Sequence, residues 1–181
     1  MSTRPVNSTF FLLVSLMFST LTVLAQGQGD KASRPSPPAT ASGKVGGATI
    51  SISYGSPSVK GRKVWGELVP YGKAWRAGAN EATIFETDKA ITVEGESLPA
   101  GKYSLFAIPG ENEWQMIFNS QTGQWGIKRG GDANRDPAND VLTVSAKPVK
   151  SSSMNERLAY EVTNNGIVLK WENLEVPIAI K

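Results

Sequence analysis

The run from Trp75 to Glu81, WRAGANE, holds the densest set of side chains that could do chemistry in this chain. An arginine fork, an amide and a carboxylate beside an indole could bind a ligand that is rich in hydroxyl groups or carries a carboxylate. The same residues could instead hold a loop in place. In that alternative Arg76 pairs with Glu81, Asn80 adopts a left-handed turn, and the indole ring fills the core.

Three further aromatic residues, Trp65, Tyr71 and Trp125, lie in segments without regular periodicity. Flat rings on the loops of a β-domain can stack against sugar rings, and the alternative is that they cap the open ends of the fold. Together with the first cluster they form the predicted ligand-binding set, which is Trp65, Tyr71, Trp75, Arg76, Asn80, Glu81 and Trp125.

The chain contains no histidine and no cysteine. This excludes a disulfide framework, a thiol nucleophile, a Ser-His-Asp triad and the usual zinc ligands. The segment 132–136 resembles the start of a calcium loop, but Pro137 and Thr143 stand where a glycine and a closing glutamate are expected. Glu81 and Glu86 form no convincing pair for carboxylate hydrolysis. We therefore assign no catalytic residue, metal ligand or cofactor, and favour a non-catalytic protein over an enzyme.

The residues that position these side chains alternate between apolar and polar, as β-strands do. Segment 54–83 follows neither strand nor helix periodicity, yet it is too aromatic for disorder, so we expect one long ordered loop. Asn164-Asn165-Gly166 separates two alternating runs and predicts a hairpin. The predicted strands are 49–54, 83–87, 91–93, 102–108, 113–119, 141–147, 158–162, 167–171 and 174–180, with 102–108 central and Pro177 at an edge. This pattern predicts an all-β fold, a single antiparallel β-sandwich or open barrel of about eight to ten short strands.

The N-terminus predicts export. An apolar run at 9–24 follows Arg4 and ends in small residues, which indicates a signal peptide over 1–25, cleaved before Gln26; a retained membrane anchor is the alternative. No cysteine follows this run, so a lipoprotein is not expected, and the mature protein should be soluble and periplasmic or secreted. Residues 26–43 predict a flexible Gly/Pro/Ser-rich linker, whose C-terminal end could pair with the next strand across Gly46-Gly47. Residues 44–181 form the predicted domain.

Charge argues against a nucleic-acid partner. The net charge is +3, and removal of Arg4 with the signal peptide leaves 18 basic against 16 acidic groups, or +2. So small an excess, with the basic residues scattered, does not indicate binding to nucleic acid or to an anionic membrane.

The runs SPSVKGRKVWGELVPYGKAWRAGANEAT, LPAGKYSLFAIPG, EWQMIFN, QWG and DVLTVSAKP resemble the secreted bacterial family catalogued as domain of unknown function 2911, over residues 48–181. The resemblance implies an exported single-domain β-protein, typical of the Bacteroidetes lineage and its relatives, and implies no catalytic residue. The sequence thus predicts a binding module for a small ligand, glycan or peptide. The alternatives are a carboxylate-dependent hydrolase and a purely structural envelope-associated domain.

Overall fold

The computed structural model describes residues 31–181, so the predicted signal peptide and the first residues of the predicted linker lie outside the described part. The fold is all-β, as predicted, with two short 3₁₀ turns. Its elements are η1 (Lys31–Ser33), β1 (Pro38–Val45), β2 (Ala48–Gly55), β3 (Ala79–Thr87), β4 (Ile91–Val93), β5 (Glu96–Leu98), β6 (Gly101–Ile108), β7 (Trp114–Asn119), η2 (Pro137–Asn139), β8 (Asp140–Ala146), β9 (Val149–Thr163) and β10 (Gly166–Ala179).

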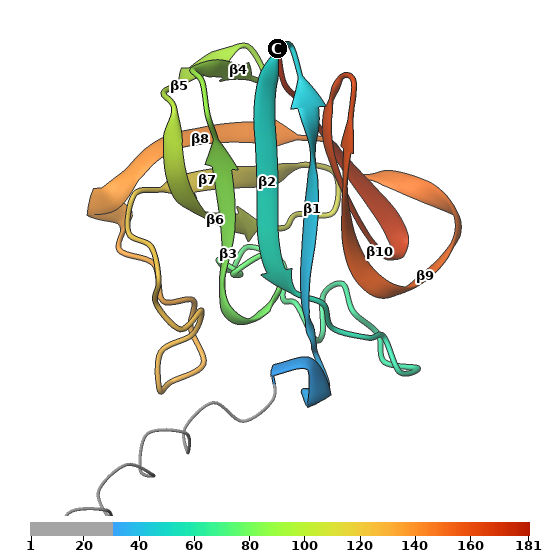
Figure 1. Ribbon diagram of the computed structural model, residues 1–181. Helices are drawn as coiled ribbons and strands as arrows, with labels where there is room; N and C mark the ends of the chain where they lie inside the picture. The colour runs from blue at the N-terminus through green and yellow to red at the C-terminus, as the bar shows by residue number, and fades with distance from the viewer. Residues whose placement is uncertain (1–30) are drawn as a thin grey trace, which may run out of the picture. The chain divides into compact units, whose positions relative to one another are not determined.

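Six strands form one antiparallel sheet in the order β1-β2-β3-β6-β7-β8. The sheet is not closed into a barrel, because its outer strands β1 and β8 each pair with one neighbour only in this sheet. It twists strongly, so that β8 runs across the direction of β2 (Figure 1). Strands β9 and β10 form a long separate hairpin, and β4 and β5 a short one. Strand β6 lies between β3 and β7, which confirms its predicted central place.

The core lies between the concave face of the six-stranded sheet and the β9–β10 hairpin (Figure 1). Alternate residues of each strand face it, as the period of two requires. The sheet contributes Ile50, Ile52, Phe85, Leu105, Trp114, Met116 and Phe118, and the hairpin contributes Leu158, Leu169, Trp171, Val176 and Ile178. Val93 and Ile180 pair at one end and tie β4 to the end of the hairpin.

Strand β1 includes residues 38–43 of the predicted linker and pairs with β2 across Gly46-Gly47, which confirms the pairing considered from the sequence; both glycines have positive φ and turn the chain back so that Val45 pairs with Ala48. Other strands differ from the sequence prediction. The segments predicted as separate strands 167–171 and 174–180 belong to one strand, β10, which continues through an irregularity where Glu172 has φ of 55°. The predicted hairpin at Asn164 and Asn165 is confirmed.

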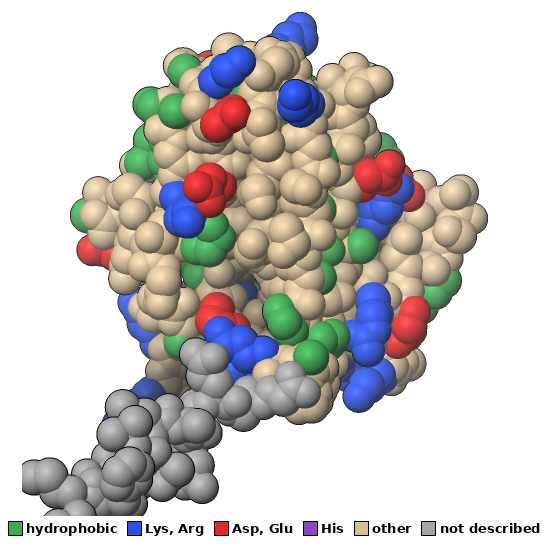
Figure 2. Space-filling view, viewed as in Figure 1, with side chains coloured by type: hydrophobic (Ala, Val, Ile, Leu, Met, Phe, Trp, Pro, Cys, Tyr) green, Lys and Arg blue, Asp and Glu red, His purple; other side chains and the backbone are tan. Residues whose placement is uncertain are grey.

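Among residues 31–181, no helix is long and apolar enough to span a membrane. On the face shown in Figure 2, basic and acidic side chains lie close together in several places, and apolar ones are scattered among them. This face therefore carries no broad patch of one charge.

Candidate functional site

The β2–β3 loop, residues 56–78, forms most of the segment 54–83 that the sequence predicts as one long ordered loop, but residues 79–83 belong to strand β3. The sheet holds the last part of this loop. Trp75 and Ala107 exchange both backbone hydrogen bonds, at 2.7 and 2.8 Å, so this residue of the loop lies beside β6 like a short strand. The indole nitrogen of Trp75 donates to the carbonyl of Gly78 at 3.1 Å. These bonds fix the direction in which Arg76, the next residue, leaves the backbone.

A strained residue follows Arg76. Ala77 has φ of 50°, in the left-handed region that non-glycine residues rarely adopt. Its carbonyl accepts hydrogen bonds from the hydroxyls of Thr83, at 3.1 Å, and Tyr160, at 2.8 Å. Burial raises the pKa of Tyr160 well above its ordinary value, so its hydroxyl stays protonated and able to donate. The core thus holds the turn that presents Arg76.

The β7–β8 loop, residues 120–139, closes the other side of the site. Its residues 124–126 run along the start of β3: Gly126 N–H donates to Asn80 O at 3.0 Å, and Ala82 N–H donates to Gln124 O at 3.1 Å. At its far end Arg135 and Asn119 donate to the carboxylate of Asp140. Burial alone would raise the pKa of Asp140, but these hydrogen bonds and the charge of Arg135 outweigh it and lower that pKa below its ordinary value.

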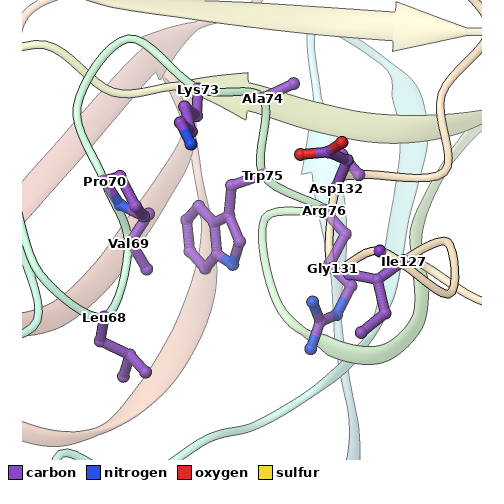
Figure 3. A pocket seen from close by; sticks show the side chains of 12 residues that line it. Leu68, Val69, Pro70, Lys73, Ala74, Trp75, Arg76, Ile127, Gly131 and Asp132 are labelled. Carbon is purple, nitrogen blue, oxygen red and sulfur yellow. The ribbon is translucent and has the colours of Figure 1, made fainter.

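The two loops border an open cavity of about 630 Å³, which we call the Trp75–Arg76 cavity. Residues 68–70 and 73–76 line it from the β2–β3 loop, and residues 127 and 130–133 line it from the β7–β8 loop. In Figure 3 the indole of Trp75 lies between Val69 on one side and Arg76 on the other, with Ile127 beyond the guanidinium. The volume falls within the range of about 300–1,000 Å³ that is typical of small-ligand sites.

Arg76 is the unusual residue of this cavity. Its Nε atom is buried and has no hydrogen-bond partner among the described residues, and burial lowers the pKa of the guanidinium. Glycine at position 126 makes room for its side chain, because a Cβ atom there would lie 2.0 Å from Arg76 Cδ. Five buried side-chain atoms of the described residues have no hydrogen-bond partner, and Arg76 Nε is the one among them that belongs to a charged residue and to the cavity lining.

Three charged side chains line the cavity, namely Lys73, Arg76 and Asp132. Two are basic and one is acidic, so the lining carries a net charge of +1. In Figure 3 the Lys73 and Asp132 side chains lie at the same end of the site, on either side of Ala74, and the guanidinium of Arg76 points away from both. The Arg76 cation is therefore open to an anion from a ligand.

Two predicted site residues do not line the cavity and instead hold the segment before β1. Glu81 accepts two hydrogen bonds from Nη1 of Arg34, at 3.1 and 3.2 Å. The Asn80 amide, on a residue with φ of 64°, donates to Ser36 O at 2.8 Å. Glu81 is thus bound to Arg34 and not to Arg76, and the loop-pinning pair considered from the sequence does not form.

The predicted aromatic residues separate into two groups. Trp65 is 5% exposed and lies in the core, where its ring is 4.8 Å from that of Trp114 and 5.6 Å from that of Trp171. Trp75 joins the same group, stacked on Trp171 at 5.9 Å, and also lines the cavity. Tyr71 and Trp125 are 39% and 48% exposed and do not line the cavity. The structure therefore forms no platform from Trp65, Tyr71 and Trp125 together.

Three other acidic residues, Asp136, Asp140 and Glu86, have structural partners. Asp136 caps η2 through Ala138 N–H, and Asp140 pairs with Arg135. Glu86 forms an ion pair with Lys102 at 3.1 Å. Among the described residues, no group of three or more histidine, cysteine or acidic side chains is arranged to hold a metal ion.

Comparison with protein families identifies the chain. The family model described as 'protein of unknown function (DUF2911)' matches residues 36–180 of the chain. The chain belongs to the DUF2911 family. Comparison with curated proteins gives no match, and comparison with solved structures gives none either.

In this DUF2911 protein, the sequence predicted Trp75 and Arg76 as site residues. It did not predict that the β7–β8 loop lines the other side of their cavity. Ile127, Asp132 and Ala133 come from a loop in which the sequence suggested only a calcium-loop resemblance at 132–136 and a possible stacking role for Trp125. The sequence does contain a signal for this loop: segment 120–139 is the second long irregular segment between predicted strands, and the other connections between those strands are shorter. Two such loops in one small β-domain are natural candidates for the walls of one site.

Proposed function

We propose that this protein is a non-catalytic binding module whose small ligand occupies the Trp75–Arg76 cavity. One observation carries the proposal: the side chain of Arg76 lines this cavity, and its buried Nε–H has no partner among the described residues. Leaving a buried polar group unsatisfied costs about 1–3 kcal/mol, and more when the group is charged. A ligand that accepts this hydrogen bond would offset that cost.

The fold holds Arg76 in place without using its charge. The Trp75–Ala107 hydrogen bonds and the strained Ala77 turn fix the backbone on both sides of it. Strained backbone that the surrounding structure holds in place is often found at binding sites. This supports recognition as the role of Arg76, in preference to support of the loop.

Carboxylate-dependent hydrolysis has less support. Asp132 is the one carboxylate among the described residues that line the cavity. Paired-carboxylate mechanisms need two acids on either side of the reacting bond. Glu81, the acid suggested by the sequence, is held by Arg34 outside this lining.

We further propose that the module acts outside the cytoplasm, as a periplasmic or secreted protein of bacterial origin. The support is the sequence of residues 1–25, which has the charge, apolar run and small terminal residues of a cleaved signal peptide. This segment lies outside the described residues. Residues 26–37 would then connect the mature N-terminus to β1.

A thermal-shift screen of sugars, short peptides and small organic acids tests the binding proposal. A ligand that binds only the folded state raises the melting temperature in proportion to RT ln(1 + [L]/Kd). Titration calorimetry then measures Kd for each hit. We expect Leu68→Asn to weaken binding at least about tenfold, because Leu68 lines the cavity and its apolar contact would be lost.

Val141→Asn is the matched control. Val141 is 46% exposed on β8 and Leu68 is 42% exposed, so both substitutions should affect stability similarly, but Val141 does not line the cavity. Equal weakening by the two variants would show that the ligand binds elsewhere. An absence of any ligand-induced shift across the whole screen would favour the structural, envelope-associated alternative.

A further inference from the structure

We infer that the ligand of the Trp75–Arg76 cavity is a small monocarboxylate with an apolar body. The inference rests on the proposed function, since it names the chemical class that the same site would take. It follows from three features of the cavity. Its arginine has an N–H group without a partner among the described residues, its charged side chains sum to only +1, and it has few other polar side chains.

The free edge of Arg76 fits a carboxylate. A guanidinium offers parallel N–H groups in one plane, and a carboxylate accepts two of them at once. The Nε–H of Arg76 is the buried member of that edge and has no partner among residues 31–181. A carboxylate in the cavity would pair with this guanidinium, because the side chain of Arg76 lines the cavity.

The surrounding charge favours a single negative charge on the ligand. Asp132 lines the same cavity and offsets one of the two cations, Lys73 and Arg76. A dianion such as a phosphate monoester would exceed the net positive charge and would meet repulsion from Asp132. A monocarboxylate matches the net charge of +1.

The arginine is arranged before the ligand arrives. Gly126 lies directly against the Arg76 stem, with its hypothetical Cβ only 2.0 Å from Cδ and 3.0 Å from Cβ of the arginine. This backbone contact, on a segment that donates to Asn80 O, limits the positions open to the guanidinium. Less side-chain freedom is lost on binding when the residue is already held.

The rest of the lining indicates an apolar body in preference to a sugar. Seven of the twelve lining residues are apolar, two are glycines and three are charged. A sugar needs several partners for its hydroxyl groups, and among the described residues Lys73, Arg76 and Asp132 alone line the cavity with polar side chains. Trp75, Ile127 and Leu68 instead offer an aromatic edge and aliphatic surface.

The test uses 3-phenylpropanoate, its neutral amide, glucuronate, glucose and inorganic phosphate as probes of the purified protein. The readouts are titration calorimetry and the ¹⁵N–¹H signal of Arg76 Nε, which Arg76→Lys identifies by its loss. We expect 3-phenylpropanoate to bind saturably and to shift this signal. We expect the amide, glucose and phosphate to bind at least about tenfold more weakly, and glucuronate to fall between them because it keeps the carboxylate but lacks the apolar body.

Variants distinguish a specific contact with Arg76 from a general effect of positive charge. Arg76→Met should weaken the binding of 3-phenylpropanoate about tenfold to a hundredfold. Arg129→Met removes an exposed cation outside the lining and should leave the affinity unchanged. Arg76→Lys keeps the charge and loses the planar fork, so it should recover only part of the affinity.

The outcomes distinguish the two levels of the proposal. If the amide or glucose binds as tightly as the acid while Leu68→Asn still weakens binding at least about tenfold, the carboxylate inference is overturned and the binding function stands. Tighter binding of phosphate than of 3-phenylpropanoate would likewise overturn it. If no probe binds and the wider screen also gives no ligand, the proposed function fails with it.

Discussion

Arg76 and Arg135 are arginines of the same chain in opposite situations. Arg135 forms an ion pair with Asp140, whose carboxylate also accepts a hydrogen bond from Asn119 at 2.7 Å. Arg76 has a buried Nε–H without a partner among the described residues. Residue types alone do not separate these roles, because both arginines have acidic residues five positions further along, Glu81 and Asp140. The sequence suggested the pair at Arg76, and the structure forms the one at Arg135.

We predict that Arg76→Met leaves the free energy of unfolding within about 0.5 kcal/mol of the original, or raises it, because no hydrogen bond to a described residue is lost and a buried charge is removed. Arg135→Met should lower it by about 1–3 kcal/mol, because Asp140 would keep its partly buried charge without its cation. Urea unfolding of both variants measures the difference. A larger loss at Arg76 than at Arg135 would assign Arg76 to loop support.

The loss of unfolding free energy caused by Arg135→Met should depend on pH. The pKa of Asp140 is lowered from its ordinary value of 3.8 in the folded state, so the stability that this carboxylate contributes is present above that value. It is lost as the pH falls through the lower folded pKa. The difference in unfolding free energy between the unsubstituted protein and Arg135→Met should therefore become smaller when the urea unfolding is repeated at pH values from 7 toward 3.

At the scale of elements, strands with one buried face were predictable and those without were not. Strand β2 alternates strictly, so it was predicted within a residue or two of its bounds. The first half of β9, from Val149 onward, was missed because most of its residues are exposed and leave no alternation to detect. The turn at Lys60 and Gly61 was missed for a different reason: lysine is not a typical residue for positive φ, yet Lys60 has φ of 50°.

Lys60→Asn should stabilise the β2–β3 loop. Lys60 and Gly61, with φ of 50° and 68°, form the centre of a tight turn in which Arg62 N–H donates to Val59 O at 3.1 Å. Asparagine tolerates this conformation better than lysine does, and Asn-Gly is the preferred pair for such turns. We expect the free energy of unfolding in urea to rise by about 0.5–1 kcal/mol. Lys63→Asn, whose residue does not have positive φ, serves as the control and should give no gain.

For the whole molecule, four tryptophans connect parts that are distant in the chain. Trp65 and Trp75 come from the β2–β3 loop, Trp114 from β7 and Trp171 from β10, with ring centroids 4.8–6.3 Å apart in five of their pairs. In the predicted strands 113–119 and 167–171, alternation places Trp114 and Trp171 on the apolar face. It could not show that both meet the loop, because that contact depends on how the sheet twists and on where the hairpin packs. The second wall of the cavity escaped prediction for the same reason.

This cluster makes the β2–β3 loop part of the core, so its loss should affect the entire domain. We predict that Trp65→Ala lowers the free energy of unfolding by about 3–5 kcal/mol, because the ring is almost fully buried among the other three indoles. Unfolding should remain a single transition, with circular dichroism and tryptophan fluorescence changing together.

Native-state hydrogen exchange gives the sharper test of the same cluster. The amides of Trp75 and Ala107, bonded to each other across loop and sheet, should lose protection to the same extent as amides paired between β9 and β10. Loss confined to the loop, with the hairpin unaffected, would show that the loop unfolds by itself and that the Trp75–Arg76 cavity can open without unfolding the core.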